Sequence, residues 1–214
     1  IGFAQDPGAD RLAVVDENGR YFGEEYTLVL ASMHWLSKNK NDSCATNLST
    51  SRMIDDVAKE FRCTSYRSAV GEANVAGVMK EHNCVIGGEG NGGVIFPKVC
   101  WVRDSLSGMA IILDLLRERE EKLSTIVNSI PKYEMIKRTI DLADLGGIPA
   151  IDKEIERLKI EYANETIDDS DGLRIDFKEG WLHVRPSNTE PIARVIAEAK
   201  DSLTAYKFAN RVKL

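Results

Sequence analysis

CATNLSTSRMIDDVAKEFRCTSY, residues 44–66, contains an apolar run, a helix-like segment and a second apolar run. The same alternation continues along the following part of the chain. The apolar runs are 44–48, 63–66 and 84–87, and the helix-like segments are 53–61, 73–82 and 105–119. Strands alternating with helices are typical of an α/β domain, so we expect a mixed, mostly parallel sheet with flanking helices. Such sheets bind ligands at the carboxyl ends of their strands, which makes the loop after residue 86 a candidate site.

The flanking segments predict the rest of the architecture. Upstream, two β-prone runs joined through Asn18-Gly19 indicate a hairpin over 12–22, because this dipeptide suits a type I′ turn. A broad apolar face over 24–38 indicates a helix. Downstream, the composition changes at Pro131 and Pro149, which have polar segments around them. We therefore place a domain boundary near residue 128.

Beyond this boundary we expect a smaller α+β domain with an antiparallel sheet. Alternating residues over 173–185 predict a second hairpin, and an amphipathic helix is expected over 203–212, after Asp201-Ser202. Residues 191–200 fit either a helix that begins at Pro191 or a strand of the sheet.

The composition limits the possible function classes. The 214 residues include 28 basic and 34 acidic side chains, a net charge of −6, which argues against nucleic-acid binding but permits a pocket for a small anion. With 43% apolar and 29% charged residues, the chain is neither disordered, collagen-like nor coiled-coil. No apolar run reaches the roughly 18 residues of a membrane span. Its 4 cysteines form no CxxC pair and fit free thiols, so we expect a cytoplasmic protein.

Residues 6–11, DPGADR, place two carboxylates in a loop ahead of an apolar strand. A turn can bring Asp6 and Asp10 onto one cation, and Mg²⁺ accepts one or two carboxylates completed by water or a substrate phosphate. A pair of solvated turn carboxylates is the alternative interpretation.

Residues 87–93, GGEGNGG, follow directly after an apolar strand-like run. Glycine lets a backbone approach a ligand closely, and Glu89 with Asn91 supplies an acceptor and an amide that suit neighbouring sugar hydroxyls. A flexible surface turn is the alternative. The position at the carboxyl end of a strand favours a binding loop.

Residues 185–191, RPSNTEP, are rich in hydrogen-bond donors. Arg185 offers a planar fork for two phosphate oxygens, and consecutive backbone N–H groups can form an anion-binding nest. This inventory suits a phosphate monoester, whereas an ordinary hairpin exit is the alternative. Together, a cation-binding loop (6–11), a loop that can bind sugar hydroxyls (87–93) and a phosphate-binding loop (185–191) indicate a site for a phosphorylated sugar.

In this order and at about these separations, DPGADR, GGEGNGG and RPSNTEP resemble the loops of the α-D-phosphohexomutase superfamily, which includes phosphomannomutases, phosphoglucomutases and phosphoglucosamine mutases. Members have four domains. The resemblance implies that residues 1–23 are the tail of the second domain with the metal loop, 24–128 the third domain with the sugar loop, and 129–214 the fourth with the phosphate loop. It also implies a strand, not a helix, over 191–199.

The resemblance further implies roles for single residues. Asp6 and Asp10 are implied as Mg²⁺ ligands, and Gly8 stands where the family usually has a third aspartate. Asn91 and Gly93 stand where the family's sugar loop commonly has serine and histidine. The implied substrate-binding residues are Arg11, Glu89, Asn91, Arg185, Ser187, Asn188 and Thr189.

The phosphate-accepting serine of the family belongs to its first domain and has no counterpart here. We therefore expect no catalytic residue in this chain, interpret it as a fragment that needs the N-terminal domains of the same protein, and predict it to be inactive alone. The complete enzyme, as the resemblance implies, interconverts hexose 1-phosphate and hexose 6-phosphate through a bisphosphorylated intermediate. A non-catalytic module that binds sugar phosphates is the alternative, motivated by Gly8.

Overall fold

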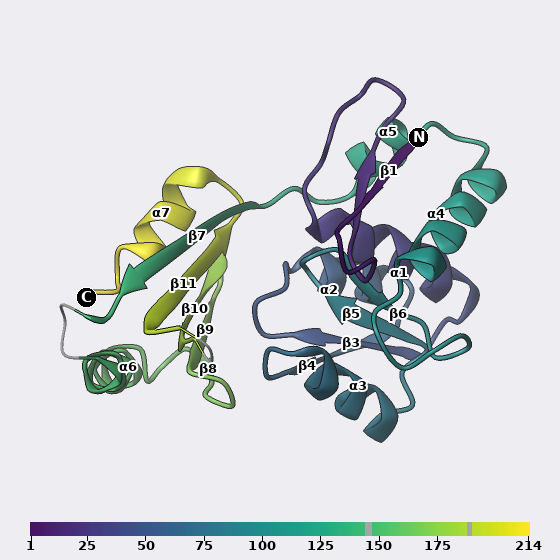
Figure 1. Cartoon of the computed structure of the whole chain (residues 1–214). Coiled ribbons are helices and arrows are strands. Elements are labelled where there is room, and N and C mark those ends of the chain that lie inside the picture. The colour runs from purple at the N-terminus through teal and green to yellow at the C-terminus, as the bar shows by residue number, and fades with distance from the viewer. Residues whose placement is uncertain (144–146, 188–189) are drawn as a thin grey trace. The chain divides into compact units, whose positions relative to one another are not determined.

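The computed structural model describes residues 1–143, 147–187 and 190–214 (Figure 1). It divides into two compact units, Ile1–Pro131 and Lys132–Leu214. The first contains a four-stranded and a two-stranded sheet, and the second contains a five-stranded sheet. Within the described residues, no helix is both long and apolar enough to cross a bilayer.

The first unit is built on a sheet in the order β4-β3-β5-β6. Strand β3 (Ser43–Asn47) pairs in parallel with β4 (Thr64–Ser68) and with β5 (Ile86–Glu89), and β6 (Gly93–Ile95) runs antiparallel to β5. The predicted mixed, mostly parallel sheet is confirmed. The glycine-rich segment is the tight hairpin between β5 and β6, so most of it belongs to strands and not to an open loop.

Helices lie on both faces of this sheet (Figure 1). They are α1 (Glu25–Lys38), α2 (Met53–Glu60), α3 (Glu72–Glu81), α4 (Ser105–Arg119) and α5 (Leu123–Ser129). Helix α1 packs against α2, α4 and the sheet, and for that reason Leu28, Val29 and Leu30 are all fully buried. Each such side chain contributes roughly 1.5–3 kcal/mol by its removal from water.

Strands β1 (Gly2–Gln5) and β2 (Leu12–Val15) pair antiparallel around residues 6–11. The hairpin predicted over 12–22 is reduced to a single bridge between Val15 and Tyr21. The expected type I′ turn is wrong, because Gly19 has a positive φ (80°) and Asn18 does not. The carboxylate of Asp16 accepts the N–H of Asn18 at 2.8 Å and so imposes a side-chain-directed turn instead.

The second unit has an antiparallel sheet in the order β7-β11-β10-β9-β8, as predicted. Its strands are β7 (Glu134–Asp141), β8 (Thr166–Asp168), β9 (Leu173–Phe177), β10 (Gly180–Pro186) and β11 (Ile192–Ala199), and its helices are α6 (Ile148–Glu161) and α7 (Ser202–Ala209). The strand implied by the resemblance over 191–199 is therefore confirmed as β11. Both helices contribute to one apolar core with alternate residues of the strands, among them Leu182 and Val184. Because side chains alternate along a strand, Trp181, His183 and Arg185 lie on the opposite face of β10.

Candidate functional site

The cation loop, residues 6–11, is anchored to the start of α4. Ser105 accepts a hydrogen bond from the Gln5 amide and donates one to the Ala9 carbonyl, both at 2.6 Å. Within the loop, Asp6 Oδ1 accepts the N–H groups of Asp10 and Arg11, both at 3.2 Å. Desolvation raises the pKa of Asp6, but these backbone hydrogen bonds and the Arg11 charge outweigh it and hold that pKa below its ordinary value.

Gly8 lies between the two carboxylates of this loop. A Cβ at this position would lie 2.7 Å from Asp10 Oδ1 and 3.5 Å from Asp6 Oδ2, so both oxygens face the same point. Carboxylate oxygens are the ligands that Mg²⁺ prefers, and two of them leave positions for water and a phosphate. The donor set therefore fits a magnesium ion on Asp6 and Asp10, with one carboxylate fewer than an aspartate at position 8 would give.

Three of the predicted site residues, Asp6, Arg11 and Asn91, line one open cleft of about 300 Å³. Arg11 directly precedes β2 and is thereby held beside the glycine hairpin, because the Leu12 N–H donates to the Gly92 carbonyl at 3.0 Å. Gly92 has a φ of 89°, and a Cβ there would lie 2.6 Å from the Leu12 carbonyl oxygen. Only glycine fits this close approach, so the sequence feature and the cleft are linked.

Glu89 lies at the end of β5 and is only 3% exposed. Its Oε1 accepts hydrogen bonds from Asn47 Nδ2 at 2.7 Å and from the Gly71 N–H at 3.1 Å, and its Oε2 accepts Arg103 Nη1 at 2.7 Å. A carboxylate has about four acceptor positions, and these contacts fill three. Over the described part of the chain, the lining of the cleft does not include Glu89.

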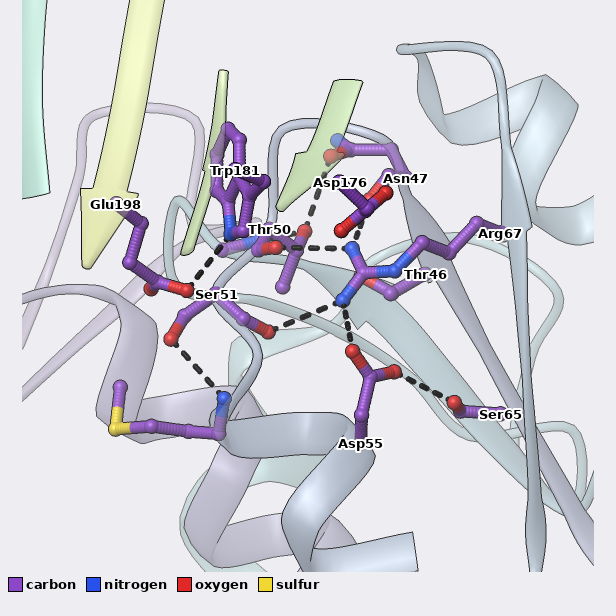
Figure 2. A network of polar contacts seen from close by, with 12 residues as sticks. Thr46, Asn47, Thr50, Ser51, Asp55, Ser65, Arg67, Asp176, Trp181 and Glu198 are labelled. Carbon is purple, nitrogen blue, oxygen red and sulfur yellow. Dashed lines mark hydrogen bonds and ion pairs between the residues drawn. The ribbon is translucent and has the colours of Figure 1, made fainter. Parts of the chain in front are cut away.

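Figure 2 shows how Asn47, the last residue of β3, and the loop that follows it are held. Arg67 Nη1 donates to the carbonyl oxygens of Asn47 and Thr50 at 3.0 and 2.9 Å, and Nη2 donates to Asp55 at 2.6 Å. The Thr50 hydroxyl donates to Asn47 Oδ1 at 3.0 Å. This contact orients the amide of Asn47 so that its nitrogen faces Glu89.

Arg103 joins the cation loop to Glu89, and the sequence gives no signal for it. Its Nη2 lies 2.6 Å from Asp10 Oδ2, its Nη1 lies 2.7 Å from Glu89 Oε2, and its Nε lies 3.1 Å from Glu72 Oε2. The residue precedes Asp104, whose carboxylate caps α4. Its partners come from three separate segments, and only the folded chain brings them together.

The phosphate segment, residues 185–191, connects β10 to β11. Arg185 is 6% exposed, and its Nε donates to Asp171 at 3.1 Å. The Ser187 N–H donates to the Ile192 carbonyl at 2.8 Å, which extends the pairing of β10 with β11 beyond Pro186 and Ala193. The predicted phosphate ligands Asn188 and Thr189 lie outside the described residues.

His183 fixes Asp171 from the other side. Its Nε2–H donates to the Asp171 carbonyl at 2.8 Å, which assigns the proton of the neutral ring to Nε2. Burial lowers the pKa of His183 to about 4, so the ring is neutral near pH 7. On the same face, Trp181 Nε1 donates to Glu198 at 2.7 Å (Figure 2).

A second group of metal-type ligands, His34, Asp114 and Glu118, joins α1 to α4. The Lys38 ammonium lies 2.9 Å from Asp114 and 2.8 Å from Glu118, so a lysine already supplies the positive charge there. These ion pairs raise the pKa of Lys38. We interpret this group as a helix–helix contact.

Comparisons with known proteins identify the family of both units of the chain. Residues 23–133 match the family model of the phosphoglucomutase/phosphomannomutase α/β/α domain III, and residues 141–213 match that of the C-terminal domain. The chain belongs to the phosphoglucomutase/phosphomannomutase family, which confirms the resemblance.

Two curated relatives show how much of the family the chain covers. It is 37% identical over 208 residues to a phosphoglucomutase/phosphomannomutase of Thermococcus kodakarensis, covering 97% of this chain and 45% of that protein. It is 34% identical over 203 residues to a probable phosphoglucosamine mutase of Methanopyrus kandleri, covering 94% and 44%. The chain thus spans about half the length of the curated relatives it matches.

Solved structures agree in fold. A phosphoglucomutase/phosphomannomutase family protein from Burkholderia thailandensis superposes with a TM-score of 0.82 at 23% identity, over 98% of this chain and 44% of that one. A putative phosphomannomutase from Thermus thermophilus gives a TM-score of 0.73 at 19% identity, over the same shares of the two chains. At these identities the likeness shows the fold alone.

Proposed function

We propose that the protein containing this chain interconverts hexose 1-phosphate and hexose 6-phosphate through a bisphosphorylated sugar. The observation that carries the proposal is the cleft in which Asp6, Arg11 and Asn91 meet. A guanidinium, a carboxylate and an amide in one cleft suit a phosphoryl group beside sugar hydroxyls. The names of the curated relatives, which are mutases for phosphorylated sugars, support the same class.

The first unit would serve the reacting end of the substrate. Asp6 and Asp10 would hold Mg²⁺, which supplies neutralisation of the phosphoryl charge during transfer. Arg11 would orient a phosphoryl oxygen. Asn91, which lines the cleft, would bind ring hydroxyls. Glu89 has one acceptor position left but is 3% exposed, so a hydroxyl would reach it only after the chain around it opens. The attacking serine would come from another part of the whole protein, as the family resemblance implies.

The second unit would hold the phosphate that does not react. Arg185 reaches its place already oriented by Asp171, so little side-chain entropy is lost when it binds an anion. Ser187, Asn188 and Thr189 would add hydroxyl, amide and backbone donors. Binding energy from a non-reacting phosphate holds the sugar in line for transfer, which lowers the barrier by prepaid orientation.

The test is a coupled mutase assay on the complete protein and on the 214-residue chain. We expect turnover of hexose 1-phosphate by the complete protein, and saturable hexose-phosphate binding without turnover by the chain alone. Arg11→Ala in the complete protein should lower kcat, whereas Arg119→Ala, on the exposed end of α4, should not. Turnover by the chain alone would contradict the assignment of the serine to another domain.

A non-catalytic sugar-phosphate-binding module is the second candidate, and Gly8 favours it because a metal ligand of the family is replaced. Calorimetry with and without Mg²⁺ separates the two, since binding indifferent to the metal, with no turnover by the complete protein, selects the module. Gly8→Asp sharpens the result. Its Cβ would meet only the carboxylate ends of Asp10 and Asp6, so the variant should fold and bind Mg²⁺ more tightly.

A further inference from the structure

Arg103 is held from both its backbone and its side chain. Its main-chain N–H donates to Glu72 Oε2 at 2.8 Å, and its Nε contacts the same oxygen at 3.1 Å. A bridge to Ile95 places it beside β6. The side chain is 16% exposed, so its contacts with Asp10 and Glu89 are largely shielded from water.

The glycine hairpin leaves the space that this side chain fills. A Cβ at Gly93 would overlap Arg103 Cδ and lie 2.9 Å from Cγ. Position 93 therefore accepts no side chain while Arg103 keeps its place. The guanidinium thus belongs to the architecture of the hairpin, and its contacts with three carboxylates follow from a fixed position.

The charges around Arg103 do not balance. The single guanidinium of Arg103 contacts three carboxylates, of Asp10, Glu72 and Glu89, while Asp6 pairs with Arg11. Two negative charges remain, which equals the charge of one divalent cation. Asp10 turns Oδ2 to Arg103 and Oδ1 to the point above Gly8, so the guanidinium and a cation at this point would share one carboxylate.

We propose that Arg103 is a positioning residue that shares Asp10 with the divalent cation and ties it to Glu89. Cation binding and sugar binding are thereby coupled through one guanidinium. The effect of Arg103 on sugar binding rests on the proposed function, whereas its effect on cation binding does not.

Removal of the guanidinium acts on the two ligands in opposite directions. The cation binds more tightly, because a neighbouring positive charge is gone and Asp10 is released. The hexose phosphate binds less tightly, because Glu89 and Asp10 lose their common partner. A residue with a merely structural role would weaken the binding of both.

The first experiment is a calorimetric titration of the metal-free 214-residue chain with Mn²⁺ as the probe. We expect Arg103→Gln to bind Mn²⁺ roughly five- to tenfold more tightly than the parent chain, the scale of one lost charge at a partly exposed site. Arg103→Lys keeps the charge and should stay within about twofold of the parent. Arg117→Gln is the matched control, because this exposed arginine pairs with Asp114 outside the site. Equal or weaker Mn²⁺ binding by Arg103→Gln, or none by either chain, overturns the proposal.

The second experiment measures amide hydrogen exchange over residues 6–11 without metal. Arg103→Gln and Arg103→Lys should both accelerate exchange of the Asp10 and Arg11 amides at least severalfold, because lysine cannot contact three carboxylates as a planar fork does. Unchanged exchange in the lysine variant contradicts the positioning role, and it decides the matter should Arg103→Gln fail to fold. If the parent binds Mn²⁺ but no hexose phosphate, the proposed function fails while the coupling of Arg103 to the cation stands.

Discussion

Arg103 in the first unit and Arg185 in the second are both shielded from water, but their partners differ. Arg103 spreads three nitrogens over Asp10, Glu72 and Glu89, whereas Arg185 forms its ion pair with Asp171 through Nε. The first arrangement fixes protein carboxylates relative to one another. The second arrangement holds the guanidinium of Arg185 through its Nε and so fixes its orientation. These partner atoms suit Arg103 to organise its surroundings, and they suit Arg185 to present charge to an anion, as proposed above.

Substitution of Arg67 gives the strongest test of an arginine that, like Arg103, holds other protein groups in place. Arg67 holds the carbonyls of Asn47 and Thr50 and the carboxylate of Asp55, and its side chain is 14% exposed. Arg67→Ala leaves these acceptors without their donor, and we expect the free energy of unfolding of the first unit to fall by about 3–5 kcal/mol.

Urea denaturation followed through Trp35 and Trp101, which both belong to the first unit, measures this loss. Arg119→Ala removes an exposed arginine from the end of α4 and should change the free energy by less than about 0.5 kcal/mol. Equal stabilities of the two variants would show that the loop after β3 needs no guanidinium.

His183 makes the stability of the second unit dependent on pH. Burial lowers the pKa of His183 to about 4 from an ordinary 6.5, so the folded state favours the neutral ring. Its contribution to stability is complete above pH 6.5 and is lost as the pH falls toward 4, by about 3 kcal/mol in total. Unfolding measured from pH 7 to pH 4 should show this slope in the second unit.

His183→Gln keeps an N–H donor for the Asp171 carbonyl but does not titrate, so its unfolding free energy should depend less on pH by about the same amount. His82→Gln, at an exposed ring stacked on Tyr66 in the first unit, serves as the control, because it leaves His183 in place and should keep the slope of the second unit. An identical slope in His183→Gln would mean that another group causes the acid sensitivity.

The sequence predicts most of the sheets and helices because their signals are local. The apolar runs at 44–48 and 84–87 and the helix-like segment at 53–61 correspond to β3, β5 and α2. The sequence shows β7 only as a polar segment, since this strand lies at the edge of its sheet and just half of its side chains are partly buried. Its pairing with β11 is a long-range fact that composition does not show.

The candidate site divides in the same way. The types of residue needed for a cation and a phosphate are visible in short loops, and Asp6, Arg11 and Asn91 indeed share one cleft. Arg103 is invisible in the sequence because its partners Asp10, Glu72 and Glu89 are distant along the chain. The burial of Glu89 was hidden for the same reason, since its neighbours come from other strands and loops.

Arg185→Ala tests whether Arg185 presents its charge to a bound phosphate. Charge-assisted hydrogen bonds to an anion contribute about 1.5–3 kcal/mol, so hexose-phosphate binding to the chain should weaken roughly 10- to 100-fold. Calorimetry measures this, with Arg194→Ala as the control, because that arginine is exposed on β11 and contacts Glu190 at 3.5 Å. Similar affinities of both variants would remove Arg185 from the phosphate site.

Gly93 lies in the glycine hairpin next to Arg103, and its substitution is expected to have the smallest effect on stability. Gly93→Ala should lower the free energy of unfolding by about 1–2 kcal/mol, because its Cβ overlaps Arg103 Cδ. Gly77→Ala, in α3 with nothing near the added methyl, should instead gain about 0.5–1 kcal/mol. In an Arg103→Ala background the cost of Gly93→Ala should vanish, since the two changes touch the same space. Additive costs in this double-mutant cycle would place the strain elsewhere in the hairpin, and the fixed position of Arg103 would then need another cause.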